Sequence, residues 1–207
     1  MNDLNILAKK NKCDKRVSDE FGGAYGYVVQ YYQYLNDHRL DFKNVLEVGV
    51  WDGRSLKMWQ EYFPNAMIYG IDDFSGIHSP ADASKIDNNR IKVVIGDQTD
   101  KDLLDSSFED IIFDTIIDDG SHRAWHTQQT FKILFPKLVS GGYYFVENLE
   151  VSPIREYREF DDVRSATIEW LESIINNDFF SYYMDKDDVA KIESIELVND
   201  LAIIKKR

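Results

Sequence analysis

The sequence predicts an α/β fold built on a mostly parallel sheet of seven strands, with an antiparallel hairpin at its C-terminal end. Short apolar runs rich in β-branched residues recur from Val45 onward, and segments with helical spacing separate them. Such alternation is typical of βαβ units, which pair their strands in parallel. The last two runs are separated by two residues only, which predicts a tight turn and an antiparallel pair.

Five strands are expected before the hairpin. They are predicted over residues 45–48, 67–71, 91–95, 113–117 and 143–146. The hairpin is predicted over Ile192 to Val198 and Leu201 to Ile204, with Asn199 and Asp200 in its turn. The five parallel strands and the two hairpin strands together make the seven-stranded sheet.

Apolar residues at helical spacing predict the helices between these strands, and prolines and glycines mark where they end. The helix after the first strand should end at Pro64, because proline cannot continue a helix. The helix before the fifth strand should tighten or kink at Pro136 and be broken by the pair Gly141 and Gly142. Two further amphipathic helices are predicted over residues 27–40 and 163–175.

The composition limits the classes of partner. The chain has 207 residues, 43% of them hydrophobic, which is enough for one domain with a real core. A net charge of −13 argues against nucleic acid and anionic membranes as partners, since both attract basic surfaces. The single cysteine, Cys13, and the absence of an apolar leader or membrane-length run predict a cytoplasmic protein.

A glycine-containing turn follows the first predicted strand and indicates a cofactor site. Glu47 lies near the end of the strand, and Gly49 and Gly53 allow a ligand to approach the backbone and the start of the next helix closely. The dinucleotide pattern G-x-G-x-x-G is absent, because Trp51 stands where its second glycine would be. The turn therefore disfavours NAD, and its pattern E-x-G-x-x-x-G resembles motif I of S-adenosylmethionine-dependent methyltransferases.

Polar residues at the ends of the next two strands extend this candidate site. Asp72 lies 19 residues beyond Gly53, where an acidic residue is expected to bind ribose hydroxyls. Asp97 and Gln98 follow the third strand, where the resembling families place adenine contacts. Asp72, Asp97 and Gln98 are therefore predicted to bind the cofactor.

A second polar cluster follows the fourth and fifth strands. The carboxyl ends of both strands should face one crevice, so Asp119, Glu147 and Asn148 are expected to converge. Three hard oxygen ligands suit Mg²⁺, with water or substrate in the remaining positions. His122, three residues after Asp119, is placed to accept a proton from a metal-bound hydroxyl.

These residues carry a resemblance to a known family. The stretch DDGSH from Asp118 to His122, the preceding FDTII, and the strand that ends at Glu147 resemble the metal-dependent macrolide-sugar O-methyltransferases of the mycinamicin and tylosin type. The DK pair at Asp14 and Lys15 and the YGY stretch that ends at Tyr27 resemble them too.

This resemblance implies a Rossmann-like class I methyltransferase fold, S-adenosylmethionine and Mg²⁺ as cofactors, and a hydroxyl of a sugar or glycosylated small molecule as methyl acceptor. It implies that Asp119, Glu147 and position 148 bind the metal, that His122 is the general base, and that Tyr27 and Asp118 lie beside the cofactor. That family has aspartate at position 148, where this chain has Asn148. We expect no counterpart of its extra N-terminal domain, and a homo-oligomer is possible.

One methyltransferase domain is expected over residues 1–207. It comprises an N-terminal helical cap, a cofactor-binding core, a substrate lid and the hairpin, over residues 1–43, 44–149, 150–191 and 192–207 respectively.

Four alternatives to parts of this interpretation remain to be weighed. Asn148 gives the metal site an Asp, Glu, Asn set, which favours a catechol-like O-methyltransferase as the second interpretation. A catalytically silent cofactor-binding module is the third, and the intact acidic and histidine positions argue against it. His122 and His126 have the spacing of a zinc helix, yet Arg123 replaces the glutamate of H-E-x-x-H and disfavours a protease. One of Asp118 and Asp119 could instead cap a helix that starts near Ser121.

Overall fold

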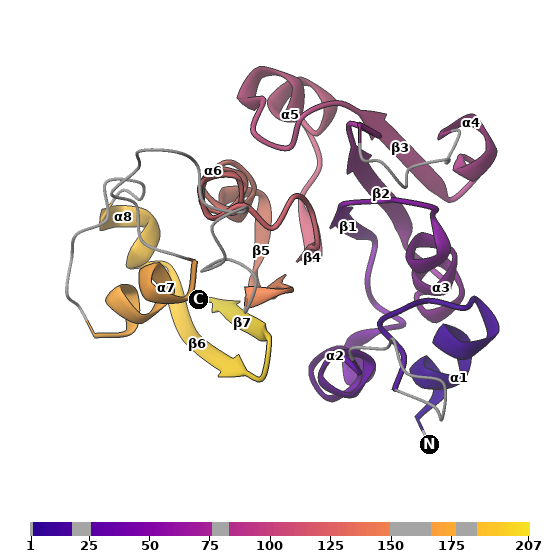
Figure 1. Ribbon diagram of the computed structural model, residues 1–207, viewed down its shortest axis with the longest axis horizontal. Helices are drawn as coiled ribbons and strands as arrows, with labels where there is room; N and C mark the ends of the chain where they lie inside the picture. The colour runs from indigo at the N-terminus through magenta and orange to yellow at the C-terminus, as the bar shows by residue number, and fades with distance from the viewer. Residues whose placement is uncertain (1, 18–25, 76–82, 150–166, 177–185) are drawn as a thin grey trace. The chain divides into compact units, whose positions relative to one another are not determined.

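The computed structural model describes residues 2–17, 26–75, 83–149, 167–176 and 186–207 (Figure 1). The chain forms two compact units, Met1–Ile95 and Gly96–Arg207, and each is described by itself. The expectation of one domain over residues 1–207 stays a prediction. The predicted lid over residues 150–191 lies largely outside the described residues.

The first unit carries three parallel strands and the helices around them. Its elements are α1 (Asp3–Lys10), α2 (Val28–Leu35), the 3-10 turn η1 (Asn36–His38), β1 (Asn44–Val48), α3 (Arg54–Tyr62), β2 (Met67–Asp72), α4 (Ala83–Ile86) and β3 (Ile91–Ile95). Strand β2 lies between β1 and β3 and pairs with both in parallel. Its register places Val48 opposite Ile71 and Asp72 opposite Ile95, so all three strands end at one edge.

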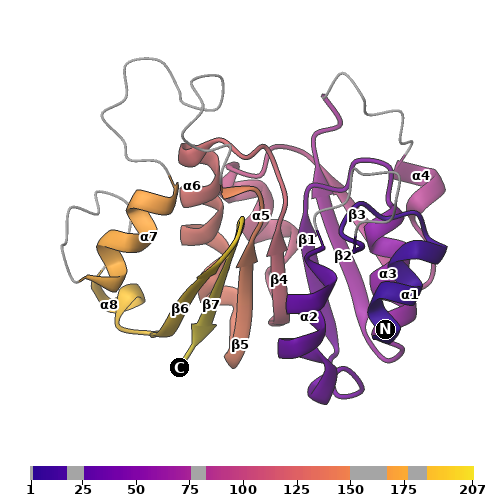
Figure 2. The same cartoon turned by 60° about the horizontal axis from the view of Figure 1, so that its bottom comes forward.

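The second unit carries four strands, and Figure 2 shows its terminal hairpin beside β5. Its elements are α5 (Lys101–Ser107), β4 (Phe113–Asp118), α6 (Ala124–Leu134), the 3-10 turn η2 (Phe135–Lys137), β5 (Leu138–Val146), α7 (Thr167–Ile175), α8 (Lys186–Val189), β6 (Ile192–Val198) and β7 (Leu201–Lys206). Strands β4 and β5 are parallel, and β7 is antiparallel to both β5 and β6.

The predicted fold class is confirmed. The strand order of the seven-stranded sheet is β3-β2-β1-β4-β5-β7-β6, with antiparallel pairing at β7. The hairpin turn is formed by Asn199 and Asp200 as expected, and Asn199 has a φ of 55°, a conformation that asparagine tolerates. The first four strands begin and end within one residue of their predicted bounds.

The fifth strand differs from its prediction, because it begins at Leu138 and includes the glycine pair that was expected to break the chain. Its register with β4 shifts between Leu138 and Tyr143, and Gly141 has a φ of 79°. A Cβ atom at Gly142 would lie 2.8 Å from the carbonyl oxygen of Asp114. The two glycines therefore form a bulge within the strand, which the sequence pattern cannot distinguish from a turn.

Both prolines act as predicted, and one helix is shorter than expected. Helix α3 ends at Tyr62, before Pro64, and α6 tightens into a 3-10 turn that contains Pro136. The helix predicted over residues 27–40 is α2 followed by η1, and that over 163–175 is described from Thr167. None of the described helices is long and apolar enough to cross a membrane.

Buried aromatic rings hold α6 and α7 against β5. Phe131 on α6 stacks on Phe135 and contacts Tyr144 and Trp170 edge-on. Lys206 at the end of β7 is 9% exposed, and its ammonium donates hydrogen bonds to three carbonyl oxygens of the segment from Phe135 to Leu138. The last strand thereby ties the end of α6, whose carbonyls would otherwise lack donors, to the sheet.

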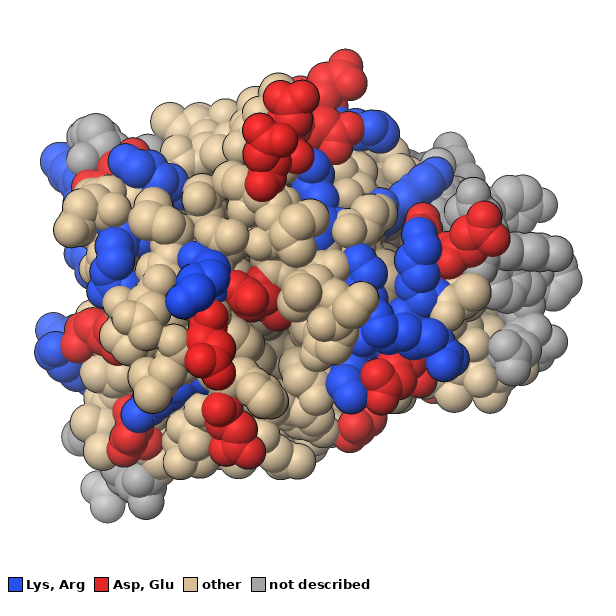
Figure 3. Space-filling view, turned by 180° about the vertical axis from the view of Figure 1, so that it is seen from behind, with Lys and Arg blue, Asp and Glu red and all other residues tan. Residues whose placement is uncertain are grey.

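Acidic and basic side chains are interspersed on the face shown in Figure 3. That face shows no large area of one sign of charge.

Candidate cofactor and metal sites

The turn after β1 has the strained backbone of a ligand-binding turn. Gly49, Trp51 and Gly53 have φ angles of 86°, 47° and 74°. Glycine adopts such angles freely, whereas a tryptophan there is strained and needs support from its surroundings. Gly53 is the N-cap of α3, and Asp52 Oδ1 accepts a hydrogen bond of 3.2 Å from the N–H of Arg54, the first residue of that helix. Gly49 and Gly53, which the motif predicts, therefore have the positive φ angles that favour glycine at these positions.

Asp72 supplies the support for this turn. Its Oδ2 accepts hydrogen bonds from the backbone N–H groups of Val50 and Trp51, at 2.7 and 2.8 Å. Its Oδ1 accepts a third from Phe74, at 2.7 Å. The acid at the end of β2 thus holds the turn after β1, a role that the sequence did not predict. A ribose contact of Asp72 stays a prediction, and the carboxylate keeps lone pairs for it.

A third glycine belongs to this site and was missed. A Cβ atom at Gly70, in the middle of β2, would lie 2.6 Å from Val50 and 2.9 Å from Leu56. The side chains of the turn and of α3 therefore pack directly on the bare backbone of β2. A glycine inside an apolar strand is the signal that could have indicated this close approach.

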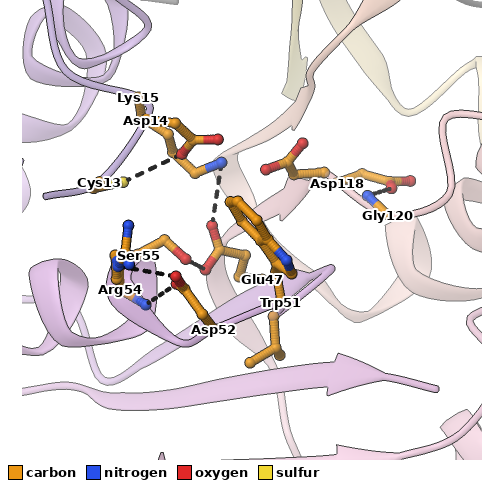
Figure 4. A network of polar contacts seen from close by, with 12 residues as sticks. Cys13, Asp14, Lys15, Glu47, Trp51, Asp52, Arg54, Ser55, Asp118 and Gly120 are labelled. Atoms are coloured by element: carbon orange, nitrogen blue, oxygen red, sulfur yellow. Dashed lines mark hydrogen bonds and ion pairs between the residues drawn. The ribbon is translucent and has the colours of Figure 1, made fainter. Parts of the chain in front are cut away.

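Glu47 and Lys15 form a buried ion pair below the turn (Figure 4). Glu47 Oε1 lies 3.5 Å from Lys15 Nζ, and the two side chains are 0% and 1% exposed. Ser55 in the first turn of α3 donates a hydrogen bond of 2.5 Å to Glu47 Oε2. Tyr27, predicted beside the cofactor, is 3% exposed and precedes Val28, whose N–H donates to the carbonyl oxygen of Lys15. Tyr27 is therefore the chain neighbour of a residue that is hydrogen-bonded to Lys15.

In the second unit, a buried acid starts the loop after β4. Asp118 is 2% exposed and accepts hydrogen bonds from the Tyr144 hydroxyl at 3.2 Å and the Gly120 N–H at 3.3 Å. Burial raises the pKa of Asp118 to about 7, and burial also raises that of Tyr144. Helix α6 begins at Ala124 with Arg123 as its N-cap, so Asp118 does not cap a helix at Ser121. Its predicted place beside the cofactor stays a prediction.

Gln98 also holds this loop. Its Oε1 accepts a hydrogen bond of 2.7 Å from the Ser121 N–H, and its Nε2 donates one of 2.8 Å to Thr130. A Cβ atom at Gly120 would lie 2.3 Å from Gln98 Oε1, so a side chain there would displace the Gln98 amide.

Asp97 is exposed and accepts two hydrogen bonds from Thr99, which outweigh partial burial and lower its pKa. Adenine contacts of Asp97 and Gln98 stay predictions.

The structure corrects the placement of His122. It was expected at the start of the next helix, but α6 begins at Ala124 and His122 lies before it with a φ of 59°. His122 Nε2 is 4.0 Å from Asp119 Oδ1, whereas His126 Nδ1 is 3.0 Å from Ser121 Oγ. The two histidines therefore do not share a helix, which removes the geometry of a zinc helix.

The three predicted metal ligands follow paired residues of adjacent strands. Asp118 pairs with Val146, so Asp119 and Glu147 each follow this pair at neighbouring strand ends, about 5 Å apart in a sheet. Glu147 is 4% and Asn148 8% exposed, and Asn148 has a φ of 58°. Two carboxylates and an amide oxygen are the donor set that Mg²⁺ prefers.

Among the described residues, no three His, Cys, Asp or Glu side chains are grouped around a possible metal position. The predicted set has two such residues, so this leaves it untested.

Comparisons with known proteins identify similar O-methyltransferases. The chain is 36% identical over 138 residues to mycinamicin VI 2''-O-methyltransferase of Micromonospora griseorubida, covering 63% of this chain and 33% of the relative. It is 32% identical over 155 residues to demethylmacrocin O-methyltransferase of Streptomyces fradiae, covering 71% and 36%. No family model matches.

A solved structure is similar over nearly the whole chain. The methyltransferase MycE of mycinamycin biosynthesis, in complex with Mg and SAH, superposes with a TM-score of 0.82 at 28% identity, covering 99% of this chain and 55% of that one. The chain has the class I methyltransferase fold. The resemblance to the macrolide-sugar O-methyltransferases is confirmed, and the chain spans between a third and about half of the length of these relatives.

Proposed function

We propose that this chain is an S-adenosylmethionine-dependent O-methyltransferase that requires Mg²⁺ and methylates a hydroxyl of a sugar or glycosylated small molecule. The observation that carries the proposal is the similarity to MycE across 99% of the chain, since another MycE structure contains Mg, SAH and mycinamycin VI. The curated relatives are named for methylation of sugar hydroxyls on natural products.

The turn after β1 is proposed to bind S-adenosylmethionine. Gly49 and Gly53 adopt the positive φ angles of the turn, and Asp72 fixes the turn through two amides. The same carboxylate is proposed to bind the ribose hydroxyls, and Asp97, Gln98 and Tyr27 to line the adenosine or its tail. Trp51 at the second glycine position disfavours the pyrophosphate of NAD.

Asp119, Glu147 and Asn148 are proposed to hold Mg²⁺. A bound divalent cation would lower the pKa of the acceptor hydroxyl and orient it. Burial of Glu147 and Asn148 keeps bulk water away from two of the three donors. Asparagine at position 148 suits the left-handed backbone found there, and its amide oxygen is a hard donor.

His122 is proposed to take the proton of the acceptor hydroxyl. It is held in the loop after β4, three residues beyond Asp119, and its ring is about a quarter exposed, so an acceptor can reach it. Its 4.0 Å separation from Asp119 places the ring beside a proposed ligand without bonding it. Methyl transfer would then be an in-line displacement helped mainly by alignment of the two reactants.

A catechol-like acceptor is the second candidate, and Asn148 in the ligand set is the feature that favours it. A cytoplasmic location and a single domain over residues 1–207 are also proposed, the former because the one cysteine, Cys13, is a free buried thiol. Nucleic acid and membranes are not proposed as partners, since the chain carries a net charge of −13.

The test is a methyl-transfer assay with S-adenosylmethionine and Mg²⁺ against a panel of demethylated glycosides and catechols, read by mass spectrometry. Methylation of a glycoside hydroxyl is expected. Methylation of catechols alone would favour the second candidate, and no transfer to either panel would contradict both.

A further inference from the structure

The side-chain amide of Gln98 is hydrogen-bonded at both ends to other parts of the second unit. Its Oε1 accepts from the Ser121 N–H at 2.7 Å, and its Nε2 donates to Thr130 Oγ1 at 2.8 Å. The side chain is buried, and Thr130 lies on α6. A residue that the sequence predicts to contact adenine therefore has its amide bonded to α6 and to the loop after β4.

Thr130 fixes the orientation of this amide. The Thr130 hydroxyl lies 2.8 Å from the carbonyl oxygen of His126 and 3.2 Å from that of Gln98, so it can donate to either while it accepts from Gln98 Nε2. The Thr130 side chain is fully buried, and a hydrogen bond shielded from water is electrostatically stronger than an exposed one. Helix α6 therefore determines which way the amide points, and this leaves Oε1 directed at the Ser121 N–H.

The loop that Gln98 holds contains a strained residue. His122 has a φ of 59°, and a residue other than glycine keeps such a conformation only where its surroundings hold it. The two residues before it are held: the Gly120 N–H donates to Asp118 Oδ1, a bond drawn in Figure 4, and the Ser121 N–H donates to Gln98. The bond to Gln98 therefore fixes the backbone directly before His122.

Asp119 depends less on Gln98, because the sheet fixes the residue before it. Asp118 is the last residue of β4, and its carbonyl oxygen accepts from the Glu147 N–H at 3.0 Å. Asp119 follows Asp118 directly, whereas His122 lies four residues beyond the end of β4. Loss of the Gln98 amide should therefore displace His122 more than the proposed metal ligand.

We propose that Gln98 is a positioning residue for proton transfer, because its amide holds the Ser121 N–H and so keeps the His122 imidazole where it can take the proton of the acceptor hydroxyl. The inference rests on the proposed function, in which His122 is the base. The hydroxyl proton passes to the imidazole as the O–CH₃ bond forms and the bond from this methyl to the sulfonium sulfur breaks. A misplacement of about 1 Å can cost on the order of 10²-fold in rate.

The first test measures turnover and cofactor affinity of Gln98→Met in the full chain, since methionine has a similar length and lacks the amide. Turnover at saturating S-adenosylmethionine and Mg²⁺, with a glycoside that the wild-type chain methylates, should fall by about 10- to 100-fold. The Kd of S-adenosylhomocysteine in calorimetry and the Mg²⁺ concentration that gives half-maximal turnover should both stay within about twofold. Unchanged turnover, or a loss of cofactor affinity as large as the loss of turnover, would overturn the proposal.

The matched control is Gln60→Met, which removes a glutamine amide that donates to Asn88 Oδ1 in the first unit and should leave turnover unchanged. Combination of Gln98→Met with His122→Ala shows whether Gln98 acts through the base. In that background Gln98→Met should lower turnover by no more than about threefold, since a base that is absent cannot be misplaced. Losses that multiply in the double variant would show a role apart from His122 and overturn the proposal.

Variants of Thr130 keep the proposal testable if Gln98→Met does not fold. Thr130→Val removes the hydroxyl that orients the Gln98 amide and should lower turnover by about 3- to 10-fold, whereas Thr130→Ser keeps a hydroxyl and should stay near the wild-type rate. Equal turnover of these two variants would overturn the proposal. If the wild-type chain transfers no methyl group, the proposed function fails first and this inference fails with it.

Discussion

The turn after β1 and the loop after β4 are both held by an acid at the end of a strand, but by different kinds of bond. Asp72 accepts three hydrogen bonds from backbone N–H groups. Asp118 is buried and accepts from one backbone N–H and from the Tyr144 hydroxyl, and Gln98 holds Ser121 in the same loop. The cofactor turn therefore depends on one carboxylate, and the loop with the proposed metal ligand depends on several side chains.

The largest effect is expected at the proposed metal site in the second unit. Asp119→Ala or Glu147→Ala should lower turnover by more than about 10²-fold, because metal stabilisation of the transition state is worth several kcal/mol. Affinity for S-adenosylhomocysteine should change little in either variant. Calorimetry and turnover measured with added Mg²⁺ would check both parts, and full wild-type activity in excess EDTA would contradict the metal requirement.

Variants of His122 test proton transfer separately from metal binding in the loop after β4. His122→Ala should lower turnover by about 10²- to 10⁴-fold, the usual contribution of a positioned base. His126→Ala is the matched control and should cost much less, since its Nδ1 contacts Ser121 rather than the proposed acceptor position. Turnover of both variants measured from about pH 6 to 9 decides, because removal of the base should change the pH profile as well as the rate. Equal losses in the two variants would exclude His122 as the base.

Asp72 tests the dependence of the cofactor turn on one carboxylate. Asp72→Asn removes the charge that accepts from Val50 and Trp51 and should weaken S-adenosylhomocysteine binding by about 10- to 100-fold. The matched control Asp73→Asn alters an exposed neighbour that bonds Ser75 and should leave affinity unchanged. Similar affinities of the two variants in calorimetry would mean that the turn does not need Asp72.

The smallest effect is expected from one of the several bonds in the loop after β4. Tyr144→Phe deletes the hydroxyl that donates to Asp118 and should lower the free energy of unfolding by about 1 kcal/mol. Because Gly120 and Gln98 remain, turnover should fall less than in His122→Ala. Urea unfolding followed by circular dichroism measures the change, and a loss several times larger would show that Tyr144 alone holds the loop.

The positions of the strands and motifs along the chain could be predicted from the sequence because they depend on apolar period and chain order. The hydrogen bonds that individual side chains make could not be predicted. Asp72 was predicted at the right strand end, yet its hold on the turn after β1 depends on side-chain direction, which spacing does not give. His122 was placed on a helix because Arg123 has no capping side chain to mark the later start at Ala124.

The burial of Lys15 is another feature that the sequence could not predict. The resemblance pointed to the Asp14 and Lys15 pair, but a lysine is expected at the surface, and its burial against Glu47 depends on packing between segments more than thirty residues apart. The glycine bulge in β5 has the same origin, since the neighbouring strand β4 decides whether the glycines turn or bulge.

Calorimetric titration with S-adenosylhomocysteine and with NAD tests the central claim most directly, because it asks which ligand the turn after β1 accepts. Binding of S-adenosylhomocysteine without binding of NAD is predicted, and a concentration of 100 times its Kd should stabilise the fold by about 2.7 kcal/mol. Binding of NAD, or no binding of S-adenosylhomocysteine, would contradict the assignment of this turn as an S-adenosylmethionine site.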